Sequence, residues 1–401
     1  MKSLYITHYG ILEPLGQSQI LPYLIGLAEN GCSIEIISFE KPALLDNGIK
    51  VEAQKDLLLS AGISWHPRPY RGGNSLSDLL RLMLRTSAEI SRRCLHHKID
   101  IVHCRSHVPC LMAWLSSPWH KKPILFDFRG FLAEEYADAG LWQHAGFRFR
   151  STKALERILL KQCKALVVLT NPARDHFCHN YSMDAKKIFV IPCCADLSRY
   201  ALKPDATSTI GKRPLHVVYS GSTVGRYDLP AMLSFFSLVL KKRPDSRFTI
   251  LSTSDLSQDR TVLDKFHLHP DSVSVVNARH QEMPSHLAAQ DLGLIMLKGD
   301  LALSVASPTK IGEYLASGLV VVAEEALGDM HKILVDSGCG ILINSSCPET
   351  WEAAADAAID LCDQSDFRKK SRLAAEQYLD LNAGIQKYLQ AYRFALGLSA
   401  G

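Results

Sequence analysis

Short runs of β-branched and aliphatic residues alternate along this chain with segments of helical length, and this alternation occurs twice. Several short runs are almost continuous in Val, Ile and Leu, which is typical of parallel strands covered by helices on both faces. The alternation predicts α/β domains with right-handed crossovers. We expect strands at residues 4–7, 34–39, 101–104, 124–128, 165–169 and 189–191, and then at 216–220, 247–251, 273–276, 292–297, 319–323 and 340–343.

The segments between these strands have helical patterns, and a polar stretch divides the chain into halves. We expect helices at residues 20–29, 77–97, 153–163, 230–241, 282–290, 308–317 and 351–361. Residues 203–209 are polar, and Gly211 and Pro214 follow before a new strand begins, which is typical of a linker. We therefore predict an N-terminal domain over residues 1–200 and a C-terminal domain over 212–377.

The end of the chain, about residues 371–398, also has helical character. It is too long for a frayed tail. We expect its last part, about residues 378–398, to form a helix that crosses back and packs on the N-terminal domain.

The composition is that of a globular protein. Of the 401 residues 47% are hydrophobic and 21% charged, and this length suits two domains better than one core. The formal net charge of +4 permits anionic ligands such as phosphates, but a nucleic-acid-binding protein would have a strongly basic face. We expect no nucleic-acid partner.

The N-terminus and the cysteines predict a cytoplasmic protein. Polar residues return at Thr7 and His8, before the apolar core of a signal peptide could form. No stretch approaches the ~18 consecutive apolar residues of a membrane span. The eleven cysteines are odd in number and lack paired metal-ligand spacing, so they are interpreted as small buried hydrophobes in a reducing compartment.

Ligands of doubly wound sheets lie at the carboxyl ends of the strands, and the clearest candidate there is the run from Ser307 to Gly318. Ser307 is predicted to be a helix N-cap, Pro308 to lie in the first turn and Gly318 to lie just past the end. The backbone N–H groups of Thr309 and Lys310 and the helix dipole favour an anion. Lys310 adds a full positive charge, which suits a diphosphate.

Glu313 lies one turn after Lys310 on the same helix face. A carboxylate there could accept hydrogen bonds from both hydroxyls of a ribose. The alternative is a surface helix on which Lys310 and Glu313 form a solvated pair, and the helical pattern alone does not decide between them.

A second candidate follows the first strand of the C-terminal half, in the turn that contains Gly221, Ser222, Gly225 and Arg226. Small residues let the backbone approach a phosphate, and Arg226 can neutralise one. Any strand-to-helix turn uses such glycines. The hypothesis therefore depends on the position of this turn opposite the helix that begins near Ser307.

The N-terminal half offers two weaker candidates. The loop between the first strand and first helix, with Gly10 and Gly16, could reach a phosphate or sugar, although glycines are common in such turns. Charged residues also gather at two strand ends, where they could position an acceptor or act as a general base. A lone histidine is more often structural, but these residues cluster: His103, Arg105, His107, Asp127 and Arg129.

A basic, partly apolar stretch spans residues 147–164. It is interpreted either as a solvated helix face or as a surface for anionic lipid headgroups on the inner membrane face. The solvated face is favoured.

Together these segments resemble the retaining glycosyltransferases of glycosyltransferase family 4, which have the GT-B fold, over nearly the whole chain. Residues 10–18 look like the family's N-terminal loop, and residues 190–200 look like its I-P-N-G-V-D interdomain signature. Residues 280–292 resemble its nucleobase loop, and 307–322 its E-Y-L-A-x-G-x-x-V-V motif. The S-P-x-K-x-x-E and R-G-F motifs are most similar to a subgroup linked to bacterial surface polysaccharides.

The resemblance implies two Rossmann-like domains facing a cleft, with the acceptor on the N-terminal domain and a nucleotide-diphosphate sugar on the C-terminal one. Such a hexosyltransferase would use a saccharide or lipid-linked saccharide as acceptor, with no metal ion and no cofactor. Arg226 and Lys310 would stabilise the departing diphosphate, and His103, Asp127 and Arg129 would serve the acceptor side. The implied donor-binding residues are Gly16, Gly221, Ser222, Arg279, His280, Gln281, Ser307, Thr309 and Glu313.

Two positions depart from the family pattern. Val305 stands eight residues before Glu313, where the family usually has a second glutamate, and Arg129 stands near the family's usual histidine. Two alternatives therefore stay open. They are a GT-B nucleotide-sugar epimerase and a non-catalytic nucleotide-sugar-binding subunit.

Overall fold

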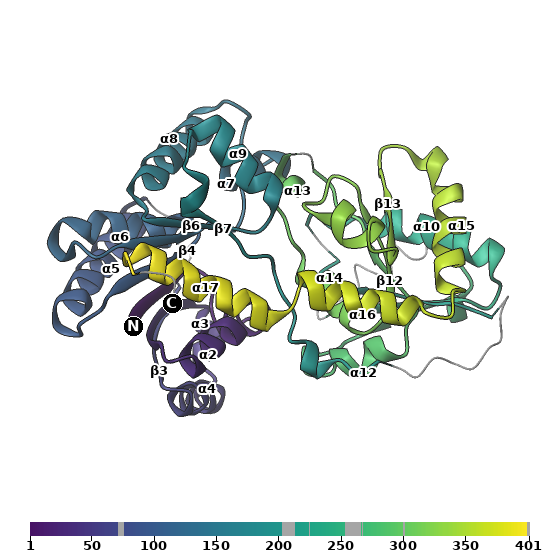
Figure 1. Cartoon of the computed structure of the whole chain (residues 1–401), viewed down its shortest axis with the longest axis horizontal. Helices are drawn as coiled ribbons and strands as arrows, with labels where there is room; N and C mark the ends of the chain where they lie inside the picture. Colours follow the sequence, from purple (N-terminus) through teal and green to yellow (C-terminus); the bar gives the residue numbers. More distant parts are fainter. Residues whose placement is uncertain are drawn as a thin grey trace. The chain divides into compact units, whose positions relative to one another are not determined.

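The computed structural model describes residues 1–70, 76–202, 213–223, 225–252, 266, 268–299 and 301–398. The chain divides into two compact units (Figure 1), Met1–Pro192 with Asn382–Gly401 and Cys193–Leu381. The segment 193–200, which we had assigned to the N-terminal domain, thus clusters with the second unit. The predicted linker at residues 203–209 and Gly211 lies outside the described residues.

The first unit contains a seven-stranded parallel sheet of order β3-β2-β1-β4-β5-β6-β7. Each strand predicted for this half is present. The strands are β1 (Lys2–Thr7), β2 (Ser33–Glu40), β3 (Ile63–Pro69), β4 (Ile101–Arg105), β5 (Ile124–Asp127), β6 (Ala165–Val168) and β7 (Ile188–Val190).

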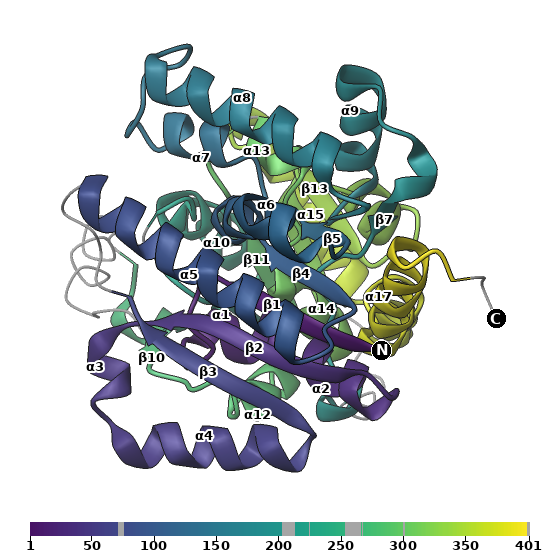
Figure 2. The same ribbon diagram turned by 90° about the vertical axis from the view of Figure 1, so that its left-hand side faces the viewer.

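Helices connect these strands and cover the sheet (Figure 2). α5 and α6 pack together, with α8 beside α6. The helices are α1 (Pro14–Gln19), α2 (Leu21–Glu29), α3 (Pro42–Leu45), α4 (Gly48–Ser60), α5 (Leu76–His96), α6 (His107–His120), α7 (Leu132–Asp138), α8 (Phe147–Gln162) and α9 (Asn171–Tyr181).

The last helix, α17 (Leu381–Ala395), packs on the first unit, which confirms the predicted return of the chain. Gly26 of α2 makes close packing possible, because a Cβ atom there would lie 2.1 Å from Ile385 Cδ1. The Tyr23 and Tyr388 rings meet edge to face, with centroids 5.3 Å apart.

The predicted helical segment 371–398 is in fact two helices, α16 (Phe367–Tyr378) and α17. The break has a physical cause in backbone pairing. The Ala195 amide donates to the Leu379 carbonyl at 2.9 Å, and the Leu381 amide donates to the Ala195 carbonyl at 3.1 Å. These groups are therefore bonded in an extended bridge rather than within one helix.

The second unit contains a six-stranded parallel sheet of order β10-β9-β8-β11-β12-β13. Each strand predicted for this half is present. The strands are β8 (His216–Ser220), β9 (Arg247–Leu251), β10 (Val273–Val276), β11 (Leu292–Ile295), β12 (Val320–Glu324) and β13 (Gly340–Ile343).

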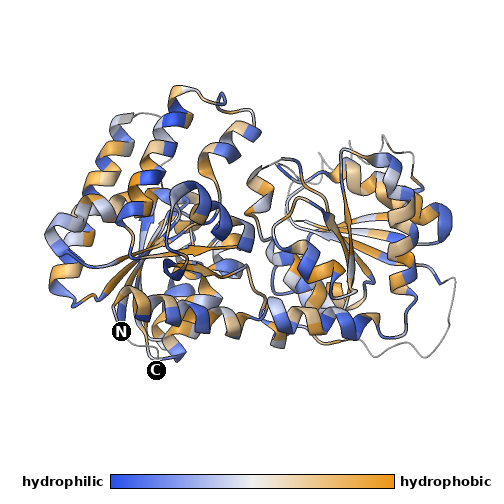
Figure 3. Ribbon diagram, turned by 45° about the horizontal axis from the view of Figure 1, so that its top comes forward, coloured by the Kyte–Doolittle hydropathy of each residue, from blue (hydrophilic) through white to orange (hydrophobic). Residues whose placement is uncertain are grey.

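Successive residues of these strands belong to different cores. Val320 and Val322 pack in the cluster around Phe235 of α10, whereas Val321 packs with Tyr314 of α14. Side chains alternate across a strand, so both faces of this sheet are buried and the strands appear as apolar runs (Figure 3). The helices are α10 (Leu229–Lys242), α12 (Met283–Ala288), α13 (Leu301–Ser304), α14 (Thr309–Ala316), α15 (Trp351–Cys362) and α16.

Short turns complete the described structure. A π-helical turn lies at His331–Val335, and 3-10 turns lie at Ala185–Lys187, Leu197–Arg199, Pro270–Ser272 and Pro348–Thr350.

Strand β3 was missed by the sequence analysis. It pairs only with β2 at the edge of the sheet, and it contains His66, Pro67, Arg68 and Pro69. Prolines are tolerated at a sheet edge, where an N–H group need not pair. The apolar continuity that revealed the other strands is therefore absent here.

Candidate functional site

Helix α14 begins after Pro308, and its first turn carries Lys310. Our prediction that Ser307 caps this helix was wrong. Pro308 occupies the cap position and has no side-chain cap, and the Ser307 hydroxyl accepts a hydrogen bond from the Cys193 amide at 3.2 Å. Ser307 thus fastens the start of α14 to the segment 193–200.

Gly318 lies just past the end of α14, as predicted. Gly318 has φ +79°, and the Leu319 amide donates to the Tyr314 carbonyl at 3.0 Å. This is the left-handed termination that glycine favours. Hydrogen bonds therefore hold α14 at both ends, and they fix the backbone positions of Lys310 and Glu313.

The Lys310 side chain is buried against two aromatic rings. Its Nζ atom lies 3.6 Å from the ring centroid of Tyr227 and 4.4 Å from that of Tyr219, and it is 3.3 Å from the Tyr219 hydroxyl oxygen. Gly221 leaves space for it, because a Cβ atom there would lie 2.6 Å from Nζ. The structure thus brings together Lys310 and Gly221, two residues predicted from separate motifs.

Burial lowers the pKa of Lys310 to about 7, and the nearby Glu313 carboxylate offsets only part of this effect. An ammonium group removed from water needs a partner of opposite charge. The cation–π contacts supply some stabilisation but no negative charge. An anion beside Gly221 would supply that charge.

Glu313 is buried one turn further along α14. Burial raises its pKa, while a hydrogen bond with Tyr200 and the charges of Lys310 and Arg199 act in the opposite direction. The His280 Nδ1 atom lies 3.9 Å from Glu313 Oε1. Burial and the charge of Arg199 lower the pKa of His280 to about 4, so this imidazole is neutral near pH 7.

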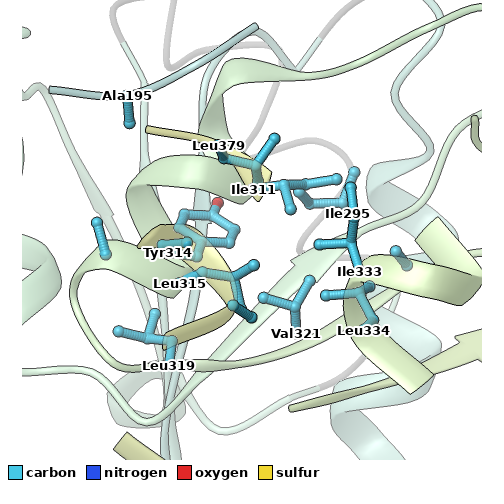
Figure 4. Packing of buried hydrophobic residues seen from close by; sticks show 14 of the residues in the cluster. Ala195, Ile295, Ile311, Tyr314, Leu315, Leu319, Val321, Ile333, Leu334 and Leu379 are labelled. Atoms are coloured by element: carbon cyan, nitrogen blue, oxygen red, sulfur yellow. The ribbon is translucent and has the colours of Figure 1, made fainter. Parts of the chain in front are cut away.

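Tyr314 fixes the turn that carries Gly221. Its hydroxyl oxygen accepts the Ser220 amide at 2.7 Å, and the Gly221 amide donates to the Leu251 carbonyl at 2.8 Å. Gly293 makes room for the ring, since a Cβ atom there would lie 2.2 Å from Tyr314 Cδ2. Figure 4 shows Tyr314 within the apolar packing of this unit.

The other residues that we predicted for this site lie on the turn after Gly221, at the start of α14 and on either side of His280. The Ser222 carbonyl accepts the Tyr219 hydroxyl, and the Arg226 carbonyl accepts the Lys298 amide at 2.8 Å. Thr309 is the first residue of α14. Arg279 and Gln281 are exposed on either side of His280.

The predicted residues of the first unit form a separate cluster. His103 Nδ1 lies 2.9 Å from the Tyr392 hydroxyl, and His103 Nε2 lies 3.6 Å from Asp127 Oδ2. Asp127 accepts the Tyr388 hydroxyl at 3.1 Å, and Arg129 Nη1 lies 3.4 Å from its other oxygen. His103 and Asp127 are each 1% exposed and join β4 and β5 to α17.

The electrostatics of this cluster are those of a buried network. Burial lowers the pKa of His103, which is therefore neutral near pH 7. The charges of Arg129 and Arg105 hold the pKa of Asp127 far below its usual range despite burial, and the nearby His103 imidazole acts in the same direction. Gln19 Oε1 accepts a hydrogen bond from Nη2 of each arginine, at 2.8 Å from Arg105 and 3.4 Å from Arg129.

Gly16 lies on α1, the helix that also carries Gln19. A Cβ atom there would lie 2.4 Å from the Gly10 carbonyl oxygen and from Ile11 Cα. The glycine therefore closes the first loop tightly on itself.

Sequence reasoning missed the aromatic and basic partners of the site, namely Arg199, Tyr200, Tyr219 and Tyr227. Tyr219 and Tyr227 flank the Gly221 turn in the sequence, and this position is the signal that could have identified them as site residues. Nothing in the sequence indicated that both rings lie against Lys310.

Two parallel α/β sheets with these connections define the GT-B fold, in which many glycosyltransferases occur. Residues 23–199 match the family model of Glycosyltransferase Family 4. No curated protein matches the chain. The chain is glycosyltransferase-like in fold, and the family match lies in its N-terminal half.

Solved structures share this fold over nearly the whole chain. A glycosyltransferase from Rickettsia africae is 18% identical with a TM-score of 0.70, and the match covers 99% of both chains. HepE from Anabaena, in complex with UDP, is 16% identical with a TM-score of 0.69, over 97% of this chain and 99% of that one. A putative UDP-N-acetylglucosamine 2-epimerase from Listeria monocytogenes is 14% identical with a TM-score of 0.59, over 98% and 95%.

The part of the chain that the structure describes lacks two features. Within this part of the chain, no helix combines the length and apolar character needed to cross a membrane. The same residues contain no group of three or more His, Cys, Asp or Glu side chains placed to hold a metal ion.

Proposed function

We propose that this protein is a retaining glycosyltransferase that moves a hexosyl group from a nucleotide-diphosphate sugar to a hydroxyl of a saccharide or lipid-linked saccharide. The observation that carries the proposal is the buried ammonium group of Lys310 beside Gly221, with the Glu313 carboxylate one turn away. A diphosphate supplies the charge that Lys310 needs, and a ribose supplies hydroxyls for Glu313.

The neighbours in fold support a uracil nucleotide as donor. HepE was solved with UDP and with UDP-glucose. The motifs similar to those of bacterial surface-polysaccharide enzymes support a role in polysaccharide or glycoconjugate assembly.

In the proposed reaction, Lys310, Arg226 and the N-terminal end of α14 stabilise the diphosphate as its bond to the sugar breaks. The acceptor hydroxyl forms the new bond to the anomeric carbon on the same face, and its proton passes to an oxygen of the departing diphosphate. These fixed positive groups would provide the charge stabilisation that a divalent cation provides in other transferases. We therefore propose that the reaction needs no metal ion, and activity that is lost in EDTA and restored by Mg²⁺ would contradict this.

A thermal-shift panel of UDP-, GDP-, ADP- and dTDP-sugars tests the donor half of this proposal. A bound donor raises the melting temperature in proportion to the logarithm of its concentration over Kd. We expect the UDP-sugar to give the largest shift and this shift to disappear with Lys310→Met. The absence of any shift at millimolar concentrations would contradict the proposal.

An epimerase is the second candidate, because 2-epimerases share the fold. Analysis of products with donor alone separates the two activities, since an epimer forms without an acceptor. Donor binding without transfer or hydrolysis across a broad acceptor panel would instead favour a non-catalytic subunit.

Donor binding should weaken as pH rises. The pKa of Lys310 is about 7 without a bound anion, and an anionic diphosphate binds the protonated form, so affinity is greatest below pH 7. Above that pH binding must take up a proton, and Kd should rise roughly thirtyfold between about pH 6 and about pH 8.5. Calorimetry measures the profile, and Lys310→Arg should flatten it because arginine stays charged. A wild-type profile as flat as that of Lys310→Arg would contradict the assignment.

We also propose that α8 contacts anionic lipids. Phe147 is 87% exposed at its start, and exposed Arg150 and Arg157 follow. Lys153 does not belong to this surface, because its ammonium group lies 2.9 Å from Glu134 and 2.6 Å from Glu156. Basic side chains beside an exposed aromatic ring are typical of a membrane-surface helix.

Vesicle sedimentation tests this surface. The protein should pellet with vesicles containing phosphatidylglycerol at low salt, and it should be released as salt screens the charges. The double substitution Arg150→Glu and Arg157→Glu should abolish pelleting. The same charge change at exposed Lys186 and Lys187 is the control. If both double variants pellet like the wild-type protein, α8 is only a solvated face.

A further inference from the structure

Arg199 makes a two-point polar contact in the candidate site, although the proposed reaction does not use it. Its Nη1 atom donates to His280 Nε2 at 2.6 Å, and its Nη2 atom donates to the His280 carbonyl at 2.9 Å. One guanidinium group therefore holds both the ring and the backbone of the same residue. Such a two-point contact fixes orientation as well as distance.

This contact also fixes the tautomer of His280. A guanidinium has no acceptor, so the Nε2 atom that receives its hydrogen bond must be unprotonated, and the proton of the neutral ring is on Nδ1. That N–H faces Glu313, whose Oε1 atom lies 3.9 Å away. The spacing is too long for a hydrogen bond, so Glu313 keeps acceptor capacity on this side.

Hydrogen bonds hold the backbone on both sides of Arg199. Asp196 accepts the Ser198 amide at 3.1 Å and the Ser198 hydroxyl at 2.6 Å, which caps the turn at Leu197–Arg199. Arg372 donates to the Tyr200 carbonyl at 2.8 Å. The guanidinium group therefore extends from a backbone segment that hydrogen bonds hold on both sides.

The same segment is packed directly on α14. A Cβ atom at Gly312 would lie 3.2 Å from Ala195 Cβ, so this glycine allows the close approach of segment and helix. Tyr200 hydrogen-bonds Glu313, and the positive charge of Arg199 stabilises the ionised carboxylate. The segment 193–200 thus contacts the helix that carries Glu313, and through Arg199 it also contacts the loop at residues 279–281.

We propose that Arg199 is a positioning residue for the nucleoside half of the donor: it holds His280 and the 279–281 loop in register with the Glu313 carboxylate. This inference rests on the proposed function. It divides the site into two parts with separate supports. Arg199 would organise the part for base and ribose, whereas Lys310 and Gly221 would organise the part for the diphosphate.

Ligand fragments distinguish these two parts. We would measure by calorimetry the binding of UMP and of inorganic pyrophosphate to the wild-type protein, Arg199→Ala, Arg199→Lys and Lys310→Met. Arg199→Ala should raise the Kd of UMP by about thirtyfold, while that of pyrophosphate should change by less than about threefold. Arg199→Lys should recover part of the UMP affinity, because lysine restores the charge and one of the two contacts. Lys310→Met should weaken pyrophosphate more than UMP.

Arg247→Ala is the matched control. It removes the same charge from an exposed position at the start of β9, and both ligands should bind it as they bind the wild-type protein. Melting temperatures of the ligand-free variants show whether each is folded, and Arg199→Lys keeps the test valid if Arg199→Ala does not fold.

The outcomes separate this inference from the proposed function. Unchanged UMP affinity in Arg199→Ala, or an equal loss for UMP and pyrophosphate, would overturn the positioning role alone. If neither UMP nor the GMP, AMP and dTMP alternatives bind the wild-type protein at millimolar concentration, the proposed function and this inference both fail.

Discussion

Replacing Lys310 by methionine should lower kcat/KM for the donor by about 10³-fold. The ammonium group is fixed beside Gly221 and shielded from water, so its charge acts strongly on a departing diphosphate. Methionine occupies a similar volume and needs no counter-charge, so the Tyr219 and Tyr227 rings keep a packing partner. Steady-state kinetics at saturating acceptor measures the effect.

A purely structural lysine would behave differently. If Lys310 only stabilised the fold, Lys310→Met would lower the melting temperature of the empty protein. We expect it to be unchanged or higher, because the variant removes a buried charge that lacks a full partner. Lys298→Met is the control, since that side chain is 63% exposed and should leave kcat/KM unchanged. Near-normal kcat/KM in Lys310→Met would exclude the diphosphate assignment.

Replacing Glu313 by glutamine should raise the donor Kd by roughly 10²-fold. A carboxylate can accept a hydrogen bond from each of two ribose hydroxyls, whereas the amide keeps one acceptor oxygen and loses the charge. Discrimination of sugars gives the sharper measurement. The wild-type protein should bind UDP more tightly than 2′-deoxy-UDP, and Glu313→Gln should bind the two almost equally.

Glu325→Gln provides the control for this prediction. Glu325 is exposed after β12, where it accepts a hydrogen bond from Asn344 at 2.6 Å. Its substitution should leave both affinities and their ratio unchanged. If Glu313→Gln retained the preference for UDP, another group would have to read the ribose.

The regular elements could be predicted well because their signals are local. Strands such as Val320–Glu324 are buried on both faces and appear as nearly continuous apolar runs, and the end of α14 is specified by Gly318. The predictions failed where a contact with a residue far away in the sequence determines the local structure. The Ser307 hydroxyl bonds the amide of Cys193 and caps no helix, and the final helical segment breaks where Ala195 pairs with residues 379–381.

The same distinction between local and long-range contacts applies to the candidate site. The spacing of Lys310 and Glu313 on one helix face could be predicted, because residues three apart in a helix are neighbours. Their burial could not, and burial decides whether they form a solvated pair or a site. Tyr219 and Tyr227 remove Lys310 from water, and Arg199 reaches His280 from a segment 81 positions earlier in the chain.

The sequence by itself therefore determined the alternation of strands and helices, the two-domain α/β class, and the residue types at the strand ends. These depend on periodicity and on terminal signals that act within a turn or two of chain. Only the tertiary structure decided which side chains lose contact with water and which charges face each other. The pKa of Lys310 near 7 and the orientation of His280 both follow from contacts between residues far apart in sequence.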